Sequence, residues 1–156
     1  MRKNYEALLW SIALPGFGQF INGKIIKGIV FLFLEFVINV RSNFNMAILY
    51  SFNGEFVNAE LVLDYQWLMF YPCLYMFSLW DAYRDANEIE QPYGYLPLVF
   101  GAYSVTVGLM IFRKVSIFGV NIGPVFTPMA FLLPGLLIGY LLRKILITPH
   151  VKKGLN

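Results

Sequence analysis

Long apolar segments with almost no charged residue alternate with short polar stretches along this chain. A helix needs about 20 apolar residues to cross the hydrocarbon core of a bilayer, or fewer where flanking side chains reach the headgroups. The pattern therefore predicts an all-α polytopic membrane helix bundle with four spanning helices. We expect these spans at residues 28–40, 65–80 and 95–112 and, from Pro124 onwards, within 115–142.

A further uncharged segment, residues 7–23, precedes these spans and is shorter and broken. Pro15 interrupts helical hydrogen bonding, and Gly16 and Gly18 permit backbone turns and close helix approach. The segment is either a re-entrant or interfacial helical hairpin or a fifth spanning segment. Its shortness favours the hairpin, provided that other helices bury the break, because a break exposed to lipid leaves backbone groups unsatisfied.

The polar connections complete a single integral membrane domain over residues 1–156. Residues 42–64 contain three acidic residues and no Lys or Arg, so we expect an external loop with a turn at Asn53–Gly54. Residues 84–94 are expected to form a short polar hinge, and a second external turn follows the third span.

The distribution of Lys and Arg predicts the orientation, because basic residues are in excess on the cytoplasmic side. With a re-entrant N-terminal segment, nine basic residues lie inside: Arg2, Lys3, Lys24, Lys27, Arg84, Arg143, Lys144, Lys152 and Lys153. Three lie outside: Arg41, Arg113 and Lys114. If the segment spans instead, the split becomes seven to five, but the later spans keep their orientation. We therefore expect the C-terminus, with its basic tail at 148–156, in the cytoplasm.

Composition points to lipid as the main solvent. Hydrophobic residues make up 58% of the 156 residues and charged residues 13%, whereas ordinary globular domains are about 25% charged. So few charges could not cover the surface of a soluble domain of this size. The net charge of +3 comes from residues expected at the cytoplasmic face, which suits anionic lipid and not nucleic acid.

Residues 18–25 have the spacing G-x-x-x-x-G-K of a phosphate-binding loop. That loop needs Ser or Thr after the lysine and a strand before it, whereas here Ile25 follows the lysine and the pattern predicts helices on both sides. Turn and packing roles explain the glycines better, since Gly23 can adopt the left-handed conformation that ends one helix before the next. The amides of Gln19 and Asn22 can satisfy backbone groups freed by the break.

The segment LPGFGQFINGKIIKGIVFL and the later WDAYRDA resemble the two-transmembrane (TM-two) domain family and its bacterial multi-pass relatives, over residues 5–90. The residues that match the family pattern are Pro15, Gly16, Gly18, Gln19, Phe20, Gly23, Lys24, Gly28 and Asp81. The chain departs from the family in the long connection at 42–64 and in an additional helical hairpin at 95–145. The resemblance implies a small membrane protein without a common catalytic activity, in a bacterial-type plasma membrane.

A stripe of small and polar residues follows the first expected span. Gly28, Glu35, Asn39 and Ser42 recur at helical spacing, so they should face other helices and not lipid. A carboxylate inside a membrane helix is costly and marks a paired or a functional site. Glu35 therefore either holds the bundle together by bonding to a Tyr, Gln or Lys, or it carries a proton or an ion.

A second group of charges, Asp81, Arg84 and Asp85, lies at i, i+3 and i+4 and can pair on one helix face near the cytoplasmic interface. It is either a solvated helix end or a structural tie. In the second case, Asp81 would accept hydrogen bonds from the amides of the glycine-rich turn and join the N-terminal hairpin to the later helix.

The remaining candidates concern packing. Gly135 and Gly139 have the G-x-x-x-G spacing that lets helices approach closely, either within the bundle or in a dimer. Cys73 is the single cysteine and His150 the single histidine, so we expect no disulfide within the chain, no metal site and no cofactor.

These features favour a membrane protein without catalytic activity whose partners are the lipid bilayer and other membrane proteins or further copies of itself. The alternative is a component of a small transporter or channel, in which Glu35, Asn39 and the helix breaks at Pro15 and Pro124 line a path. A membrane-embedded enzyme is the least favoured class, because convergent acids, bases and metal ligands are nearly absent.

Overall fold

The computed structural model describes residues 2–87, 91–116 and 119–153, with side chains described between residues 5 and 147 of those ranges. Its regular elements are helices, which confirms the predicted all-α class. They are α1 (Arg2–Ala13), α2 (Phe17–Ile21), α3 (Ile25–Ser42), α4 (Phe44–Phe52), α5 (Phe56–Val62), α6 (Tyr65–Leu68), α7 (Tyr71–Ala86), α8 (Leu96–Ile111), the 3-10 helix η1 (Phe112–Lys114) and α9 (Gly123–Lys153).

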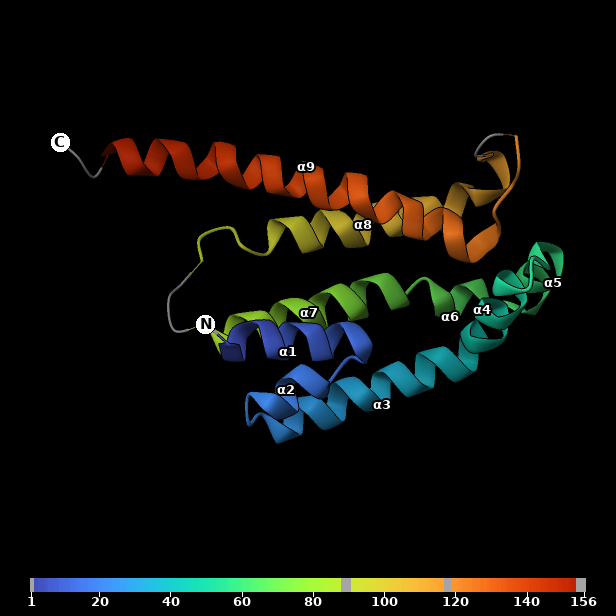
Figure 1. Cartoon of the computed structure of the whole chain (residues 1–156), viewed down its shortest axis with the longest axis horizontal. Helices are drawn as coiled ribbons and strands as arrows, with labels where there is room; N and C mark the ends of the chain where they lie inside the picture. Colours follow the sequence, from blue (N-terminus) through green and yellow to red (C-terminus); the bar gives the residue numbers. More distant parts are fainter. Residues whose placement is uncertain (1, 88–90, 117–118, 154–156) are drawn as a thin grey trace.

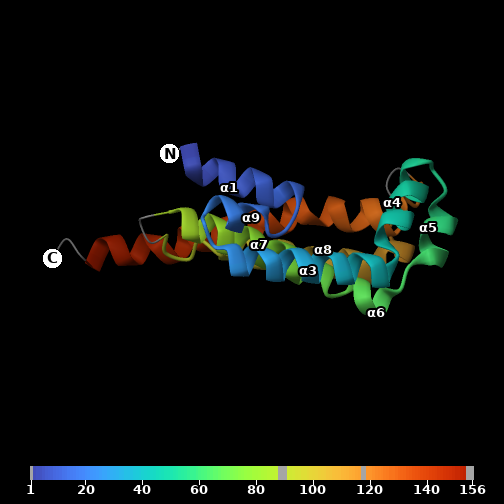
Figure 2. The same ribbon diagram turned by 90° about the horizontal axis from the view of Figure 1, so that it is seen from below.

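The longer helices lie roughly along one axis (Figure 1). Helices α8 and α9 form an antiparallel pair, and α7 packs between this pair and the helices α1 and α3. Helices α4 and α5 lie at the end opposite to both termini in this view and in the turned view (Figure 2). The molecule therefore has one end formed by both termini and the C-terminal end of α7, and another formed by the α4–α5 hairpin.

Two segments, and not the predicted four, are long and apolar enough to cross a membrane. They are Leu96–Lys114, which comprises α8 and η1, and Gly123–Ile147 of α9. Only 22% of the apolar window in the first and 28% in the second is buried inside the molecule. Most of their apolar surface therefore faces outwards, unlike the core helix of a soluble protein.

The two earlier predicted spans are shorter or more polar than the sequence pattern indicated. Helix α3 has 18 residues, but they include Lys27, Glu35 and Arg41. The predicted helix at 65–80 divides into α6 and the 16-residue α7, because Pro72 lies in the first turn of α7 and has no N–H to continue the preceding helix.

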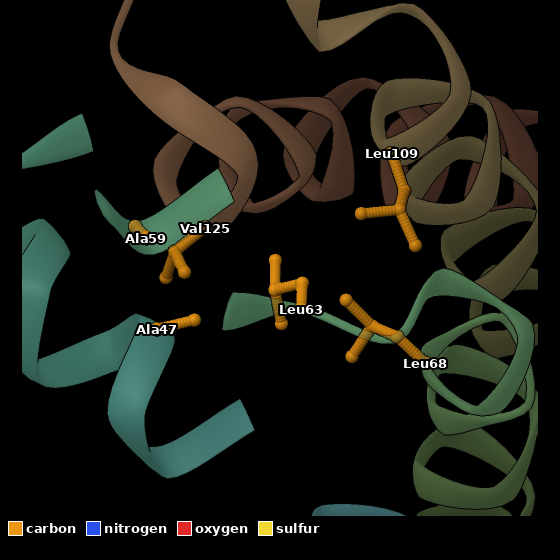
Figure 3. Packing of buried hydrophobic residues seen from close by; sticks show 6 residues of the cluster. All are labelled: Ala47, Ala59, Leu63, Leu68, Leu109 and Val125. Carbon is orange, nitrogen blue, oxygen red and sulfur yellow. The ribbon is translucent and has the colours of Figure 1, made fainter. Parts of the chain in front are cut away.

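The connection at 42–64, predicted to be an external loop, is instead a helical hairpin made of α4 and α5. The predicted turn at Asn53–Gly54 is present, with Gly54 at a φ of 78°. Figure 3 shows why the hairpin is ordered: its small and apolar side chains pack against α6, α8 and α9. The residues of this cluster are Ala47, Ala59, Leu63, Leu68, Leu109 and Val125.

The N-terminal segment folds as a helical hairpin, and its break at Pro15 and Gly16 is buried. Helix α1 ends at Ala13 and α2 runs back towards the N-terminus, so α3 begins at the same end of the molecule (Figure 1). Gly16 has a φ of 105°, and a Cβ there would lie 2.5 Å from the carbonyl oxygen of Gly28. Gly23 has a φ of 73° and separates α2 from α3, as predicted.

Helix α9 begins as expected at the Gly123–Pro124 step, where the Oδ1 atom of Asn121 accepts a hydrogen bond from the Gly123 N–H. Gly135 and Gly139 lie against α8. A Cβ on Gly135 would be 2.5 Å from the carbonyl oxygen of Phe100, and a Cβ on Gly139 would be 2.4 Å from the carbonyl oxygen of Leu96. The G-x-x-x-G pair therefore packs within the chain, against α8, which is the first of the two roles considered for it. The α9 backbone continues into the predicted tail, whose side chains, with His150, lie outside the described residues.

Candidate functional site

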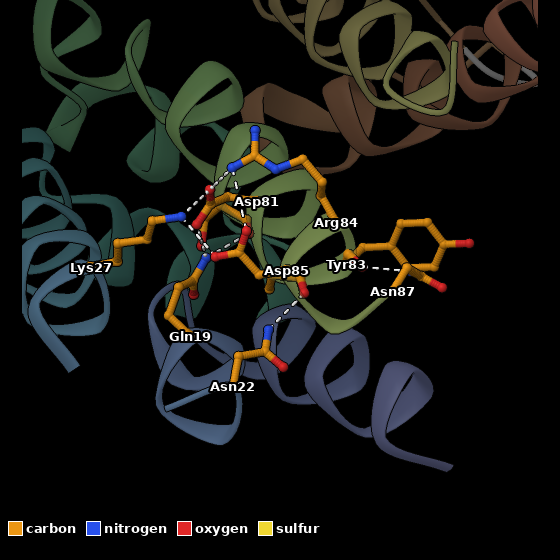
Figure 4. Close-up of polar contacts among 10 residues, drawn as sticks. Gln19, Asn22, Lys27, Asp81, Tyr83, Arg84, Asp85 and Asn87 are labelled. Carbon is orange, nitrogen blue, oxygen red and sulfur yellow. Dashed lines mark hydrogen bonds and ion pairs between the residues drawn. The ribbon is translucent and has the colours of Figure 1, made fainter. Parts of the chain in front are cut away.

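A buried polar cluster joins the N-terminal hairpin to the C-terminal end of α7 (Figure 4). Asp81 is at its centre and is only 3% exposed. Its Oδ1 atom accepts from Nζ of Lys27 at 2.9 Å and from Nη2 of Arg84 at 2.7 Å. Its Oδ2 atom accepts from Nε2 of Gln19 at 3.3 Å. Three elements, α2, α3 and α7, thus meet at one carboxylate.

Asp85, one turn after Asp81, binds the same two cations. Its oxygens lie 2.7 Å from Nζ of Lys27 and 3.4 Å from Nη2 of Arg84. The predicted pairing along the helix face is confirmed, but the sequence did not reveal Lys27 as the partner that bridges both carboxylates. The cluster has two acidic and two basic groups, so its formal charges cancel.

These contacts shift the pKa values of Lys27 and Asp85. Partial burial by itself lowers the pKa of Lys27, but the hydrogen bonds to Asp85 and Asp81 outweigh it and hold that pKa above its ordinary value. For Asp85, burial acts to raise the pKa, and the hydrogen bond and charge of Lys27, aided by Arg84, leave it lowered. Both shifts favour the charged forms of Lys27 and Asp85.

Two amide side chains complete the tie between the hairpin and α7. Nε2 of Gln19 also donates to the Ser78 carbonyl oxygen at 2.9 Å, and Nδ2 of Asn22 donates to the Ala82 carbonyl oxygen at 2.8 Å. The side chain of Gln19 is fully buried. The tie predicted for Asp81 therefore exists, but its donors are side chains. The prediction that an amide of the glycine-rich turn donates to Asp81 is confirmed for the side chain of Gln19.

The glycines of the hairpin allow these polar groups to reach α7. A Cβ on Gly18 would lie 2.3 Å from the Ala7 carbonyl oxygen and 2.8 Å from the Cβ of Ala82. A Cβ on Gly28 would lie 2.4 Å from the ring of Phe20. Backbone and ring atoms occupy the space that a side chain would need, so α1, α2, α3 and α7 can be this close only with glycine at these positions.

Glu35 forms a second polar contact, nearer the middle of the bundle. It is 5% exposed, and its Oε1 atom accepts from the hydroxyl of Tyr71 at 2.9 Å. Asn39, one turn later, also interacts with this carboxyl group, whereas the buried Oε2 atom has no hydrogen-bond partner among the described residues. The tyrosine partner agrees with one of the options considered for Glu35. No signal in the sequence singled out Tyr71 among the ten tyrosines.

An apolar groove of about 630 Å³ lies beside these contacts. Helix α7 forms its floor, α8 and α9 one wall, and α1 and α4 its two ends. Tyr71 lies in its lining as well as on Glu35. The groove is open to the surroundings and its lining is almost entirely apolar, so an apolar occupant suits it better than water.

The chemistry of these sites is that of packing and charge pairing. Among the described residues, no group of three or more His, Cys, Asp or Glu side chains is arranged to hold a metal ion. The one cysteine, Cys73, is exposed on α7. Comparisons with models of protein families, with curated proteins and with solved structures found no match to this chain.

Proposed function

We propose that this protein is a small multi-pass integral membrane protein that acts by packing with other components of the membrane and not by catalysis. The observation that carries the proposal is the outward-facing apolar surface of α8 and α9, of which less than a third is buried inside the molecule. Apolar surface on this scale needs lipid or protein partners. The charge cluster and the glycine contacts then fix the packing of the helices that carry this surface.

Helices α3 and α7 are further spans in this proposal, with their Lys, Arg and Asp residues at the headgroups and Glu35 inside the bundle. Lys27, Arg84 and the two carboxylates that they bind lie at one end of the molecule, and Arg41 lies near the other end of α3. The apolar face of α3 is strongly exposed, with Ile26 at 80% and Phe36 at 65%. A span can be shorter than 20 residues where lysine and arginine reach outwards from its ends.

The resemblance to the TM-two family supports the same proposal. Of the residues that match the family pattern, Gly16, Gly18 and Gly28 lie in close contacts and Gln19 meets Asp81. Such contacts explain the residues that match the family pattern by helix packing, and they require no catalytic activity. We place the protein in a bacterial-type plasma membrane with its C-terminus in the cytoplasm.

Two measurements test the proposal. Alkaline washing should leave the protein in the membrane fraction, and release without detergent would contradict the proposal. In a Cys73→Ser background, single cysteines at Asn4 and at Gly54 should react with a membrane-impermeant maleimide from opposite sides. Because the N-terminal hairpin and α3 both lie between these positions, labelling of both from the same side would contradict the proposed topology of this part of the chain.

One observation keeps the transporter alternative open for test. Glu35 has a buried carboxylate oxygen without a hydrogen bond, and its partner Tyr71 lines the groove. If the carboxyl group carries a proton or an ion, Glu35→Gln and Asn39→Ala should abolish transport in vesicles but leave assembly intact. Copurification of a stable partner that is insensitive to both changes would favour the packing role.

A further inference from the structure

The apolar groove has a shape that follows from the N-terminal hairpin. Helix α1 ends at Ala13 and the chain turns back at Pro15, so α1 covers only part of the length of α7 (Figure 1). Beyond Ile12, the space between α7 and the α8–α9 pair stays uncovered until α4 closes it at the other end. The groove is thus bounded at both ends and open sideways.

We infer that this groove binds one acyl chain of a phospholipid, taken from the leaflet that surrounds α4. The inference rests on the proposed membrane location and names the partner that fits this surface. A second copy of the chain, a foreign helix and a free fatty acid are the other occupants that the experiment must separate from it.

The length of the groove matches one leaflet. Its lining on α9 extends from Pro124 to Leu136, a distance of about 18 Å at 1.5 Å per residue. Half of a hydrocarbon core is about 15 Å, whereas a spanning helix needs about 30 Å. The groove is therefore long enough for one extended acyl chain and too short to line a spanning helix along its length.

The polarity of the lining excludes occupants with polar groups. The hydroxyls of Tyr71 and Tyr75 are the polar side-chain groups among the lining residues, and both protons are already donated, the first to Glu35 and the second to the Ile12 carbonyl oxygen. Water needs two to four polar partners to occupy a cavity, and an amide or hydroxyl placed here would lose its hydrogen bonds. A hydrocarbon chain loses nothing, because it carries no such groups.

Photocrosslinking in vesicles of phosphatidylethanolamine and phosphatidylglycerol tests the inference. The probe is a phosphatidylethanolamine with a diazirine in one acyl chain, and the crosslinked residues are mapped by mass spectrometry. Leu132→Trp fills the groove from α9, whereas Leu133→Trp is the matched control, since Leu133 is the next residue, is 71% exposed and does not line the groove. Val105→Phe fills the groove from α8 and serves if Leu132→Trp does not fold.

The expected result is crosslinking to groove residues of α7 and α9 in the wild type and in Leu133→Trp, and its loss in the groove-filling variants. Equal crosslinking in all variants, or crosslinking only to outward-facing residues, would overturn the inference. So would a protein–protein crosslink through the groove, or competition by free fatty acid but not by phospholipid. In each of these cases the protein can still resist alkaline extraction, so the inference can fail while the proposed membrane location stands.

Discussion

The charge cluster predicts that Asp81→Asn destabilises the protein far more than Asp85→Asn. Both substitutions remove a negative charge beside Lys27 and Arg84 and keep the size of the side chain. Asp81 has a side chain only 5% exposed and accepts from three donors, whereas the Asp85 side chain is 13% exposed and accepts from two. The amide group that Asp81→Asn introduces would also turn a donor towards Nε2 of Gln19, because the Oδ2 atom of Asp81 accepts from that nitrogen in the wild type.

The size of the effect follows from these contacts. A hydrogen bond to a charged group contributes about 1.5–3 kcal/mol. Lys27 and Arg84 are 41% and 52% exposed, so solvent screens both ion pairs and each contributes well below that range. Adding the lost bond from Gln19, we expect Asp81→Asn to cost roughly 2–3 kcal/mol. We expect Asp85→Asn to cost at most about 1 kcal/mol.

The assay is thermal or denaturant unfolding of the purified protein in one detergent, with helix content measured by circular dichroism. A double-mutant cycle with Gln19→Leu separates the contribution of the amide contact from that of the cations. The reasoning is refuted if Asp81→Asn unfolds at the wild-type midpoint, or if the two aspartate variants lose the same stability. Either result would mean that the cluster is a solvated helix end.

Three further outcomes follow from the same structure. The contribution of Asp85 and Lys27 to stability should depend on pH at both extremes. The lowered pKa of Asp85 gives stability that is lost as pH falls below its ordinary value of 3.8. The raised pKa of Lys27 gives stability that is lost as pH rises above 10.5, and both losses are measurable as shifts in the unfolding midpoint. Gly18→Ala should cost about 3 kcal/mol or more, because it forces a methyl group against backbone atoms of α1. The control Gly54→Ala meets nothing within 4 Å and should cost only about 1 kcal/mol, for its positive φ. Equal unfolding midpoints of the two variants would contradict the close packing at Gly18. Tyr71→Phe removes the hydroxyl that donates to the buried carboxylate of α3 and should cost about 1–3 kcal/mol in the same assay, and an unchanged midpoint would show that this hydrogen bond is not formed.

The sequence by itself determined the features that depend on neighbours along the chain. Proline and glycine chemistry predicted the break at Pro15, the separation of α2 from α3 at Gly23 and the start of α9 at the Gly123–Pro124 step. Proline restricts the backbone and glycine permits left-handed conformations wherever they occur in a chain. Helical spacing likewise predicted the pairing of Asp81 with Arg84. The long apolar segments predicted the all-α class and the two helical segments, at α8 and α9, that are long and apolar enough to cross a membrane.

Only the tertiary structure decided which distant groups meet. Gln19 and Asp81 are 62 residues apart and Glu35 and Tyr71 are 36 apart, and nothing local selects these partners. The same holds for residues 42–64, which form helices because α6, α8 and α9 provide a surface on which their small side chains are buried. The groove is the clearest case: it is the space left where α1 ends short of α4, and a space between helices depends on where all of them pack and not on any one segment.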